Sequence, residues 1–345
     1  MRMGTLERPR LVATDLDGTI VREDGTISAR TVAAFTRVAD RGSRFVLVTG
    51  RPPRLMGPVA DAFAHHGVAI CSNGALIYDL HRRTVRSEHA IAPAVVAEVA
   101  RRLRAALPGL GLAVEHAHHL VADPSYEPGD WDRGAEIVRV PPQELPAGPA
   151  PKLIARHPLL GADELLARAA PLVDDLVTVY HSNGERLIEA VAPGVSKASA
   201  LERLAAELGV SAADAIAFGD MPNDLPMLAW AGTSYAVANA HPRVLAQADH
   251  VIGSNEEDAV AGVLERLFAG APAGSASAGA AAAASASVPA GAVPAGSGPA
   301  EAEAGAGAAS VAAPAPAPAP AGVVPAAPPH ASARADSPEE AQVSP

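Results

Sequence analysis

Five charged residues of this sequence have the types and spacing of a site that holds a divalent cation beside an anion. They are Asp15, Asp17, Lys197, Asp220 and Asp224. The aspartate pairs follow short apolar runs, at 11–14 and 215–218, so each pair ends a predicted strand. Two bare carboxylates about 4 Å apart repel each other by roughly 4 kcal/mol at an effective dielectric constant near 20. A divalent cation between the carboxylates would remove that repulsion. Mg²⁺ is the expected cation, because a set of oxygen ligands without His or Cys favours it over zinc.

Groups able to bind phosphate lie at the end of another predicted strand and at the start of a predicted helix. Thr49 and Gly50 follow a third apolar run, 44–48, and Lys197 opens a predicted helix at 196–208. A helix N-terminus attracts anions through its unpaired amides. Thr49, Lys197 and loop amides would therefore bind the phosphate oxygens that Mg²⁺ does not contact. The pattern indicates a phosphoryl-transfer site that works by positioning and charge neutralisation.

The elements that must position these residues alternate between short apolar runs and longer amphipathic patterns. We expect strands at 11–14, 44–48, 68–71, 75–78, 152–155, 176–180, 186–191, 215–218, 234–237 and 250–252. We expect helices at 28–41, 93–107, 162–172, 196–208, 225–231 and 258–268. This alternation is typical of an α/β protein with a parallel sheet. The carboxyl ends of parallel strands share one edge, where ligands bind, so the polar clusters should meet there.

Composition limits the class of protein. The chain has 345 residues, a net charge of −11 and one cysteine, Cys71, which we expect to be buried. A single cysteine excludes a disulfide framework and favours a reducing, cytoplasmic location. No stretch approaches the roughly 20 apolar residues of a membrane span, and the apolar run at 11–14 is too short for a signal peptide. The acidic balance and the 3% aromatic content argue against nucleic-acid binding.

The last part of the chain differs from the rest. Residues 271–345 are mostly Ala, Pro, Gly and Ser and include the alternating segment APAPAPAPAG at 313–322. Such a segment buries too little apolar surface to offset the entropy of ordering, so we expect a disordered tail. Its protein partners and its role cannot be inferred from the sequence.

Several motifs together resemble the haloacid dehalogenase-like (HAD) hydrolase superfamily, in particular its Cof-type, sugar-phosphatase-like subfamily IIB. They are DLDGT at 15–19, TGRP at 49–52, SNGA at 72–75, GVSKASAL at 194–201, GDMPNDLPML at 219–228, AVANAHPRV at 236–244 and ADHVIGSNEEDAVA at 248–261. The resemblance covers residues 10–268. Each motif alone is a weak signal, but their order and the long gap between the second and fourth make the set specific.

The resemblance implies a Rossmann-like, doubly wound parallel-sheet core interrupted by an inserted α/β cap of the C2 type. The core would comprise residues 10–83 and 190–270, the cap residues 84–189, and the disordered tail residues 271–345. The cap region contains Pro-rich breaks around 141–151, which distinguish it from the core. A cap of this kind would close over the site and select the substrate.

The resemblance also implies a role for each site residue. Asp15 would be the nucleophile that forms an aspartyl-phosphate, and Asp17 would act as acid and then base. The expected Mg²⁺ ligands are Asp15, Asp17 (through its main-chain carbonyl), Asp220 and Asp224. The expected phosphate or substrate contacts are Thr49, Gly50, Asn73, Lys197 and Asn223.

The resulting hypothesis is a Mg²⁺-dependent phosphatase of small phosphate monoesters, such as sugar phosphates or related metabolites. A phosphotransferase or mutase on the same scaffold is an alternative, since it would need the same aspartates. A phosphorylated receiver-like module is disfavoured by Asp17, which would hydrolyse the phosphoaspartate. A non-catalytic scaffold with a partner-binding tail is disfavoured by the complete set of acids, Thr49, Lys197 and Asn223.

Other polar residues have more than one interpretation. Arg51 contacts substrate or, as we favour, supports its loop through an ion pair. Asn73 forms a hairpin turn or contacts substrate. Three histidines are expected at the surface rather than in a metal site: His116, His118 and His119. Tyr126, Asp130 and Trp131 either line the substrate pocket or pack against the cap sheet.

Overall fold

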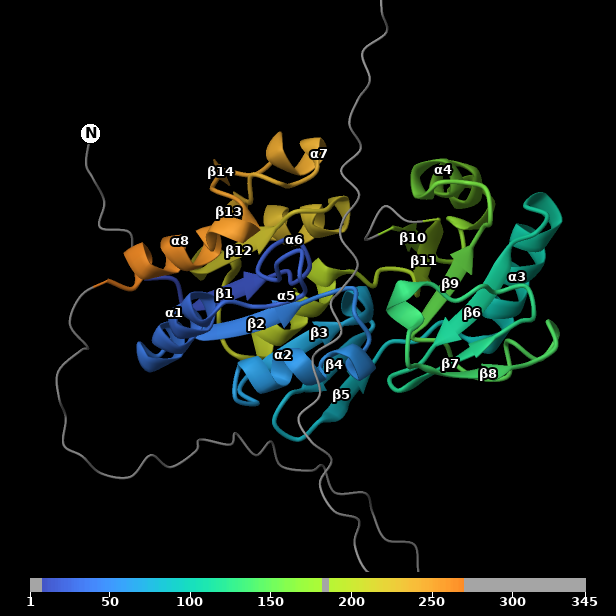
Figure 1. The fold of residues 1–345 in the computed structure, drawn as a ribbon, viewed down its shortest axis with the longest axis horizontal. Coiled ribbons are helices and arrows are strands. Elements are labelled where there is room, and N and C mark those ends of the chain that lie inside the picture. Colours follow the sequence, from blue (N-terminus) through green and yellow to red (C-terminus); the bar gives the residue numbers. More distant parts are fainter. Residues whose placement is uncertain (1–7, 182–185, 270–345) are drawn as a thin grey trace, which may run out of the picture. The chain divides into compact units, whose positions relative to one another are not determined.

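The computed structural model describes residues 8–181 and 186–269, and the predicted tail at 271–345 lies outside them. The described residues form two β-sheets with accompanying helices (Figure 1), so the predicted α/β class is confirmed. None of the helices in these two ranges is long and apolar enough to cross a membrane.

The first sheet has eight strands and carries the predicted site. Its strands are β1 (Leu11–Thr14), β2 (Arg44–Val48), β3 (Val68–Cys71), β4 (Leu76–Asp79), β5 (Thr84–Glu88), β12 (Ala215–Gly219), β13 (Thr233–Ala236) and β14 (His250–Val251). Their order is β14-β13-β12-β1-β2-β3-β4-β5. The pairs from β14 to β3 are parallel, and β4 and β5 add two antiparallel strands. The doubly wound parallel core is therefore present, with β1 at its centre.

The central strands of this sheet are apolar because they are covered on both faces. All four residues of β1 are buried, and Ala13 lies opposite Ala217 on one side and Val46 on the other. The helices of this part are α1 (Ala29–Asp40), α2 (Gly57–Ala62), α5 (Lys197–Glu207), α6 (Leu225–Trp230), α7 (Pro242–Leu245) and α8 (Ala259–Leu267). Helix α1 packs on α8, and α5 packs on α6.

Local sequence signals explain where the helices begin. Ser28 is the N-cap of α1, and its side chain accepts a hydrogen bond from the amide of Thr31. Ser196 caps α5 in the same way through the amide of Ser199, so Lys197 is the first residue of that helix. The Ser196 N-cap thus fixes the position at which the Lys197 side chain leaves the backbone.

The second sheet has six strands and is mostly antiparallel. Its strands are β6 (Gly111–Glu115), β7 (His119–Ala122), β8 (Glu136–Arg139), β9 (Lys152–Arg156), β10 (Thr178–Tyr180) and β11 (Leu187–Val191), in the order β10-β11-β9-β6-β7-β8. Only the β7–β8 pair is parallel. Two helices accompany it, α3 (Pro93–Ala106) and α4 (Ala162–Val173).

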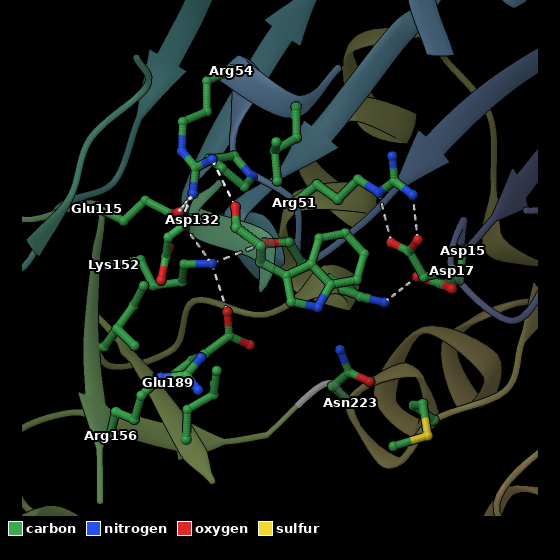
Figure 2. Close-up of a pocket in the computed structure, with 18 of the residues that line it drawn as sticks. Asp15, Asp17, Arg51, Arg54, Glu115, Asp132, Lys152, Arg156, Glu189 and Asn223 are labelled. Carbon is green, nitrogen blue, oxygen red and sulfur yellow. Dashed lines mark hydrogen bonds and ion pairs between the residues drawn. The ribbon is translucent and has the colours of Figure 1, made fainter. Parts of the chain in front are cut away.

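Side chains of β9 and β11 alternate between two environments, as a strand requires. Leu153 and Ile188 belong to the apolar cluster that includes buried residues of α3 and α4. Lys152, Ile154 and Glu189 instead line a pocket shared with the polar loops of the first sheet (Figure 2). The second sheet therefore supplies one wall of the pocket.

The structure corrects several details of the sequence analysis. Thr84–Glu88, which we placed in the inserted segment, pairs with β4 and extends the first sheet. The tight turn that joins β4 to β5, in which Arg83 has a φ of 54°, explains this pairing. The strand β11 crosses the expected boundary at residue 189. Six strands and helices were not predicted: β5, β6, β7, β8, α2 and α7. The division into a two-part core and a cap stays a prediction.

Candidate active site

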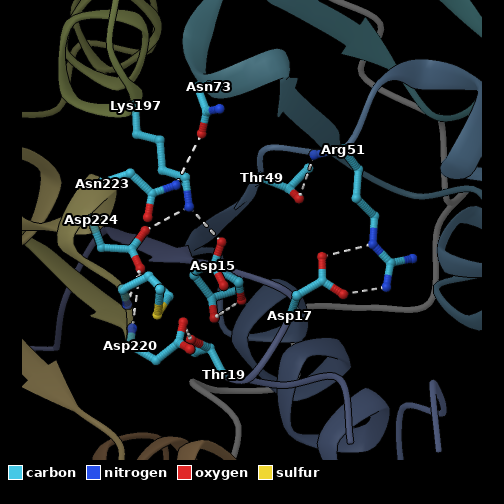
Figure 3. A network of polar contacts seen from close by, with 12 residues as sticks. Asp15, Asp17, Thr19, Thr49, Arg51, Asn73, Lys197, Asp220, Asn223 and Asp224 are labelled. Carbon is cyan, nitrogen blue, oxygen red and sulfur yellow. Dashed lines mark hydrogen bonds and ion pairs between the residues drawn. The ribbon is translucent and has the colours of Figure 1, made fainter. Parts of the chain in front are cut away.

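The polar residues that follow four neighbouring strands meet at one edge of the first sheet (Figure 3). Asp15 follows β1, Thr49 follows β2, Asn73 follows β3 and Asp220 follows β12. These strands are adjacent and parallel, in the order β12-β1-β2-β3. The expected convergence of distant sequence clusters is therefore present in the structure.

Lys197 lies between two carboxylates at this edge. Its ammonium donates to Asp15 Oδ1 at 2.5 Å and to Asp224 Oδ1 at 2.6 Å, and its side chain is 2% exposed. Burial disfavours the charged ammonium, but attraction to Asp15 and Asp224 outweighs it and raises the pKa of Lys197. Lys197 therefore stays protonated at any physiological pH.

Asp15, Asp220 and Asp224 form the acidic cluster. One carboxylate oxygen of each lies within 4.8 Å of the others. The Thr19 hydroxyl donates to Asp220 Oδ1 at 3.0 Å. The second oxygen of Asp224 accepts the main-chain amides of Asp220 and Met221 at 3.1 and 3.0 Å. Together with the Lys197 contact to Asp15, hydrogen bonds therefore orient all three carboxylates.

The charge of this cluster fits a divalent cation. Burial raises the pKa of Asp15 to about 7, with repulsion from Asp224 and Asp17 adding to it and Lys197 opposing it. Burial, together with Asp15 and Asp224, likewise raises the pKa of Asp220 well above its usual range. A cation at the cluster would offset both effects, and the donors are all oxygens, as Mg²⁺ prefers. In the part of the chain that the structure describes, no other His, Cys, Asp and Glu side chains are grouped in this way.

Asp17 does not join the acidic cluster through its side chain. Its carboxylate accepts from Arg51, with Nε 2.8 Å from Oδ2 and Nη2 donating to Oδ1. The main-chain amide of Arg51 donates to the Thr49 hydroxyl oxygen at 3.0 Å. The proton of that hydroxyl therefore points away from the Arg51 amide. The ion pair expected of Arg51 is therefore present, and Arg51 also lines the pocket.

Asn73 connects the two sheets and contacts Asn223. Asn73 has a φ of 54°, a left-handed conformation that Asn tolerates better than most residues. Its Oδ1 accepts from Asn223 Nδ2 at 3.0 Å, and its Nδ2 donates to Glu189 Oε2 at 3.1 Å. Asn223 Oδ1 is buried and has no hydrogen-bond partner among the described residues. It is an acceptor that a ligand's donor could satisfy.

A second lysine lies at the centre of a buried charge network, which sequence reasoning missed. Lys152 contacts Glu115 at 2.5 Å and Glu189 at 2.6 Å, and donates to the carbonyl of Gly50 at 3.0 Å. The Lys152 side chain is 4% exposed. Burial disfavours its charge, but Glu115 and Glu189 outweigh this and raise its pKa. The loop that carries Thr49 and Gly50 is thus attached to the second sheet.

Arg54 continues this network. Its guanidinium donates to Glu115 Oε1 at 2.8 Å, lies 3.5 Å from Asp132 Oδ1, and donates to the carbonyl of Trp131 at 3.0 Å. Tyr126 and Trp131 both line the pocket, and the Tyr126 hydroxyl donates to Asp132 at 2.8 Å. Trp131 thus lines the pocket, whereas Tyr126 both lines it and packs against the second sheet, in the apolar cluster with Leu120.

The remaining candidates do not join the acidic cluster. Cys71 is fully buried, as expected, and burial raises the pKa of its thiol. The rings of His116 and His119 stack on each other with centroids 4.7 Å apart, and neither belongs to the acidic cluster. These residues therefore carry no argument for a second metal site.

Comparison with known proteins places this arrangement in a family context. The family model described as haloacid dehalogenase-like hydrolase matches residues 12–264. The chain is 28% identical over 276 residues to the pyridoxal phosphate phosphatase YbhA of Escherichia coli, covering 73% of this chain and 96% of that one. It is 29% identical over 264 residues to the HMP-PP phosphatase of Cronobacter sakazakii, covering 73% and 93%.

Solved structures share the fold. A haloacid dehalogenase-like hydrolase from Bacteroides thetaiotaomicron superimposes with a TM-score of 0.63 and 25% identity, covering 75% of this chain and all of that one. The HAD subclass IIB sugar phosphatase BT4131 gives a TM-score of 0.65 at 19% identity, covering 74% and 98%. The second likeness concerns the fold alone.

Proposed function

Because the chain belongs to the haloacid dehalogenase-like hydrolase family, we propose that it is a Mg²⁺-dependent phosphatase of small phosphate monoesters. The family model bears out the predicted haloacid dehalogenase-like membership, and the fold shared with the subclass IIB structure supports the predicted Cof-type, subfamily IIB assignment. The relatives named above act on phosphorylated small molecules, which supports a substrate of that size. The main structural support is Lys197, which bridges Asp15 and Asp224 beside Asp220.

In this proposal Asp15 is the nucleophile. A carboxylate oxygen of Asp15 bonds to phosphorus while the bond from phosphorus to the ester oxygen breaks. Asp17, protonated before this step at an oxygen that has left Arg51, donates that proton to the departing alcohol. Asp17 then takes a proton from water, which attacks the aspartyl-phosphate and releases inorganic phosphate and free Asp15. The Lys197 ammonium and the Thr49 hydroxyl bind the phosphate oxygens that become more negative during transfer.

Asp15, Asp220 and the main-chain carbonyl of Asp17 would hold Mg²⁺, with Asp224 close by. The cation would neutralise the carboxylates and the phosphate, so that the two can approach each other. Both oxygens of Asp224 are already engaged, with Lys197 and with the amides of Asp220 and Met221. We therefore propose that Asp224 mainly orients Lys197.

Two further interactions would position the proposed acid Asp17 and the side chains that contact the substrate. Arg51 fixes the carboxylate of Asp17 at the edge of the pocket. Asn223, together with Asn73 and the amide of Gly50, lies beside the pocket and would contact the phosphate or the ester group. The segment that carries the second sheet would be the predicted C2-type cap. A cytoplasmic location, inferred from the single cysteine, stays a prediction.

The test is inorganic phosphate release from a panel of phosphorylated metabolites, with and without Mg²⁺. We expect release from the wild type only with Mg²⁺ and no release from Asp15→Asn. The exposed Asp40, at the last position of α1, supplies a matched control, since Asp40→Asn should retain full activity. Isomerised sugar phosphate without free phosphate would favour a mutase. No product at all from folded wild-type protein would contradict the phosphatase proposal.

A further inference from the structure

We propose that Lys152 is a positioning residue for phosphate transfer, and that from the second sheet it holds the phosphate-binding loop at 49–51 in its working shape. The inference rests on the proposed function, because it concerns how Thr49 and Gly50 are presented to the phosphate. Its observations are the hydrogen bonds to three successive carbonyls of this loop and a ring of contacts that joins two of them.

Each of the three successive carbonyls of the loop accepts a hydrogen bond. The outer two, those of Thr49 and Arg51, accept main-chain amides of the turn at 72–73, both at 3.0 Å. This turn directly follows β3, so these two donors belong to the first sheet. The middle carbonyl, that of Gly50, accepts from Lys152 Nζ at 3.0 Å. The middle peptide of the loop is therefore the one that the second sheet holds.

The Gly50 carbonyl and the Arg51 amide belong to one trans peptide group. Because this group is planar, its carbonyl and its N–H point in opposite directions. The carbonyl accepts from Lys152, and the N–H donates to the Thr49 hydroxyl oxygen at 3.0 Å (Figure 3). The proton of that hydroxyl then points away from the amide, as a donor to phosphate requires. Lys152 thus orients the Thr49 hydroxyl through a single rigid unit.

A closed ring of hydrogen bonds joins the loop to the second sheet. Lys152 donates to Glu189 Oε1 at 2.6 Å (Figure 2), and Glu189 Oε2 accepts from Asn73 Nδ2 at 3.1 Å. The main-chain amide of Asn73 donates to the Thr49 carbonyl. The ring therefore begins and ends at neighbouring carbonyls of the loop, those of Thr49 and Gly50. Neither carbonyl can rotate without breaking a hydrogen bond of the ring.

Lys152 is itself held in place by a second carboxylate. Its ammonium lies 2.5 Å from Glu115 Oε2, and its side chain is 4% exposed. The other oxygen of Glu115 accepts from Arg54, at 2.8 Å. A buried ammonium between two buried carboxylates cannot leave them without a large cost in free energy. It therefore presents its N–H to the Gly50 carbonyl from a fixed point, which a lysine at the surface would not do.

The same loop carries the residue that orients the proposed acid. Arg51 directly follows the peptide carbonyl that Lys152 holds, and its guanidinium binds both oxygens of Asp17. A rotation of this peptide would therefore displace the Thr49 hydroxyl and the Arg51 fork together. A misplacement of about 1 Å can lower a rate by about a hundredfold. Loss of the Lys152 contact should thus slow turnover of every substrate, whereas a residue that only selects the alcohol would affect large substrates alone.

The experiment measures kcat and KM for two substrates of unlike size: acetyl phosphate, whose leaving group is small, and the best ester of the metabolite panel. The variant combines Lys152→Met with Glu189→Gln, which removes one cation and one anion and so keeps the net charge of the buried network. Assays are run at a temperature at which circular dichroism shows the variant to be folded.

We expect kcat of the double variant to fall about tenfold to a hundredfold, by the same factor on both substrates. Glu189→Gln alone keeps the contact from Lys152 to Gly50 and should lose clearly less. Orthovanadate adopts the five-coordinate geometry of the transition state, whereas inorganic phosphate is tetrahedral. The affinity of the double variant for orthovanadate should therefore fall more than its affinity for phosphate.

Arg30→Met combined with Glu265→Gln is the matched control. It makes the same charge changes in an ion pair between α1 and α8, and neither residue lines the pocket. This control should leave both substrates unaffected. A loss confined to the larger ester, an unchanged kcat in the folded double variant, or an equal loss in the control would overturn the inference and leave the phosphatase proposal intact. Absence of phosphate release by the wild type from every compound would overturn both.

Discussion

Arg51 binds Asp17 in a two-pronged arrangement, with Nε 2.8 Å from one carboxylate oxygen and Nη2 on the other. The Arg51 side chain is 11% exposed, so solvent screens this pair only weakly. The planar fork of a guanidinium matches a carboxylate in a way that the single ammonium of lysine does not. The orientation of the proposed acid therefore depends on the shape of Arg51 as well as on its charge.

We predict that Arg51→Lys lowers kcat by roughly tenfold to a hundredfold, because the proton donor is no longer fixed toward the leaving oxygen. Steady-state kinetics with a substrate from the metabolite panel would measure the effect. The exposed pair of Arg10 and Asp214 provides the control, and Arg10→Lys should have no effect. An unchanged kcat in Arg51→Lys would show that Asp17 is positioned without the fork.

The charge network around Lys152 predicts a large loss of stability on removal of its ammonium. Lys152→Met leaves Glu115 and Glu189 buried with fewer cations, and losing one partner of a buried pair costs about 3–5 kcal/mol. Urea unfolding would measure the change in the free energy of unfolding. Adding Glu189→Gln to Lys152→Met should recover part of the loss, since one buried charge disappears. A double variant no more stable than Lys152→Met would contradict the pairing.

The raised pKa of Asp15 predicts that pH changes the stability of the metal-free protein. A carboxyl whose pKa rises from 3.8 to about 7 on folding favours the folded state at low pH, and this contribution is lost as pH rises through 7. Asp15→Asn cannot ionise. The variant should therefore gain stability relative to the wild type between about pH 4 and pH 8, on the order of a few kcal/mol.

Thermal unfolding in a chelator at several pH values would measure this difference. Saturating Mg²⁺ should reverse it at pH 8, because a cation stabilises the ionised carboxylates of the wild type. The control is Asp40→Asn, whose difference from the wild type should not change over this range. A difference for Asp15→Asn that is independent of pH would contradict the predicted shift.

Gly74 supports the start of the helix that carries Lys197. Its φ is 105°, and an added Cβ would lie 2.2 Å from the main-chain oxygen of Ser196. Gly74→Ala should therefore both destabilise the protein and lower activity, because the N-terminus of α5 must shift. Gly134 also has a positive φ, of 74°, but an added Cβ meets nothing within 4 Å. Gly134→Ala should show the backbone strain alone, about 1 kcal/mol, with activity retained.

The fold and the proposed site of the first sheet could be predicted because their signals are local. An apolar run that stops at a polar cluster correctly located β1, β2 and β3, and Ser28 correctly marked the start of α1. Parallel topology then brings the strand ends together without further information. The pairing of Lys197 with Asp15, 182 residues away, follows from that topology.

The second sheet was harder to predict, because its charged residues form part of ordinary strands. A lysine or glutamate in a short strand normally indicates a solvent-facing side, yet Glu115, Lys152 and Glu189 are buried. Their partners come from different strands, so neither the burial nor the pairing has a signature in any one segment. The alternation in KLIAR at Lys152–Arg156 was the available signal, since every second residue lines the pocket.

Lys152 and Lys197 are the only lysines of the chain, and both side chains are at least 96% buried. Apart from the α-amino group, the native protein therefore offers no accessible primary amine to an acylating reagent. Arginine supplies the other side-chain cations, and its guanidinium does not react with such reagents. Incorporation of an amine-specific label at these two positions would thus report opening of the pocket or unfolding, and a bound ligand that touches Lys197 should slow it.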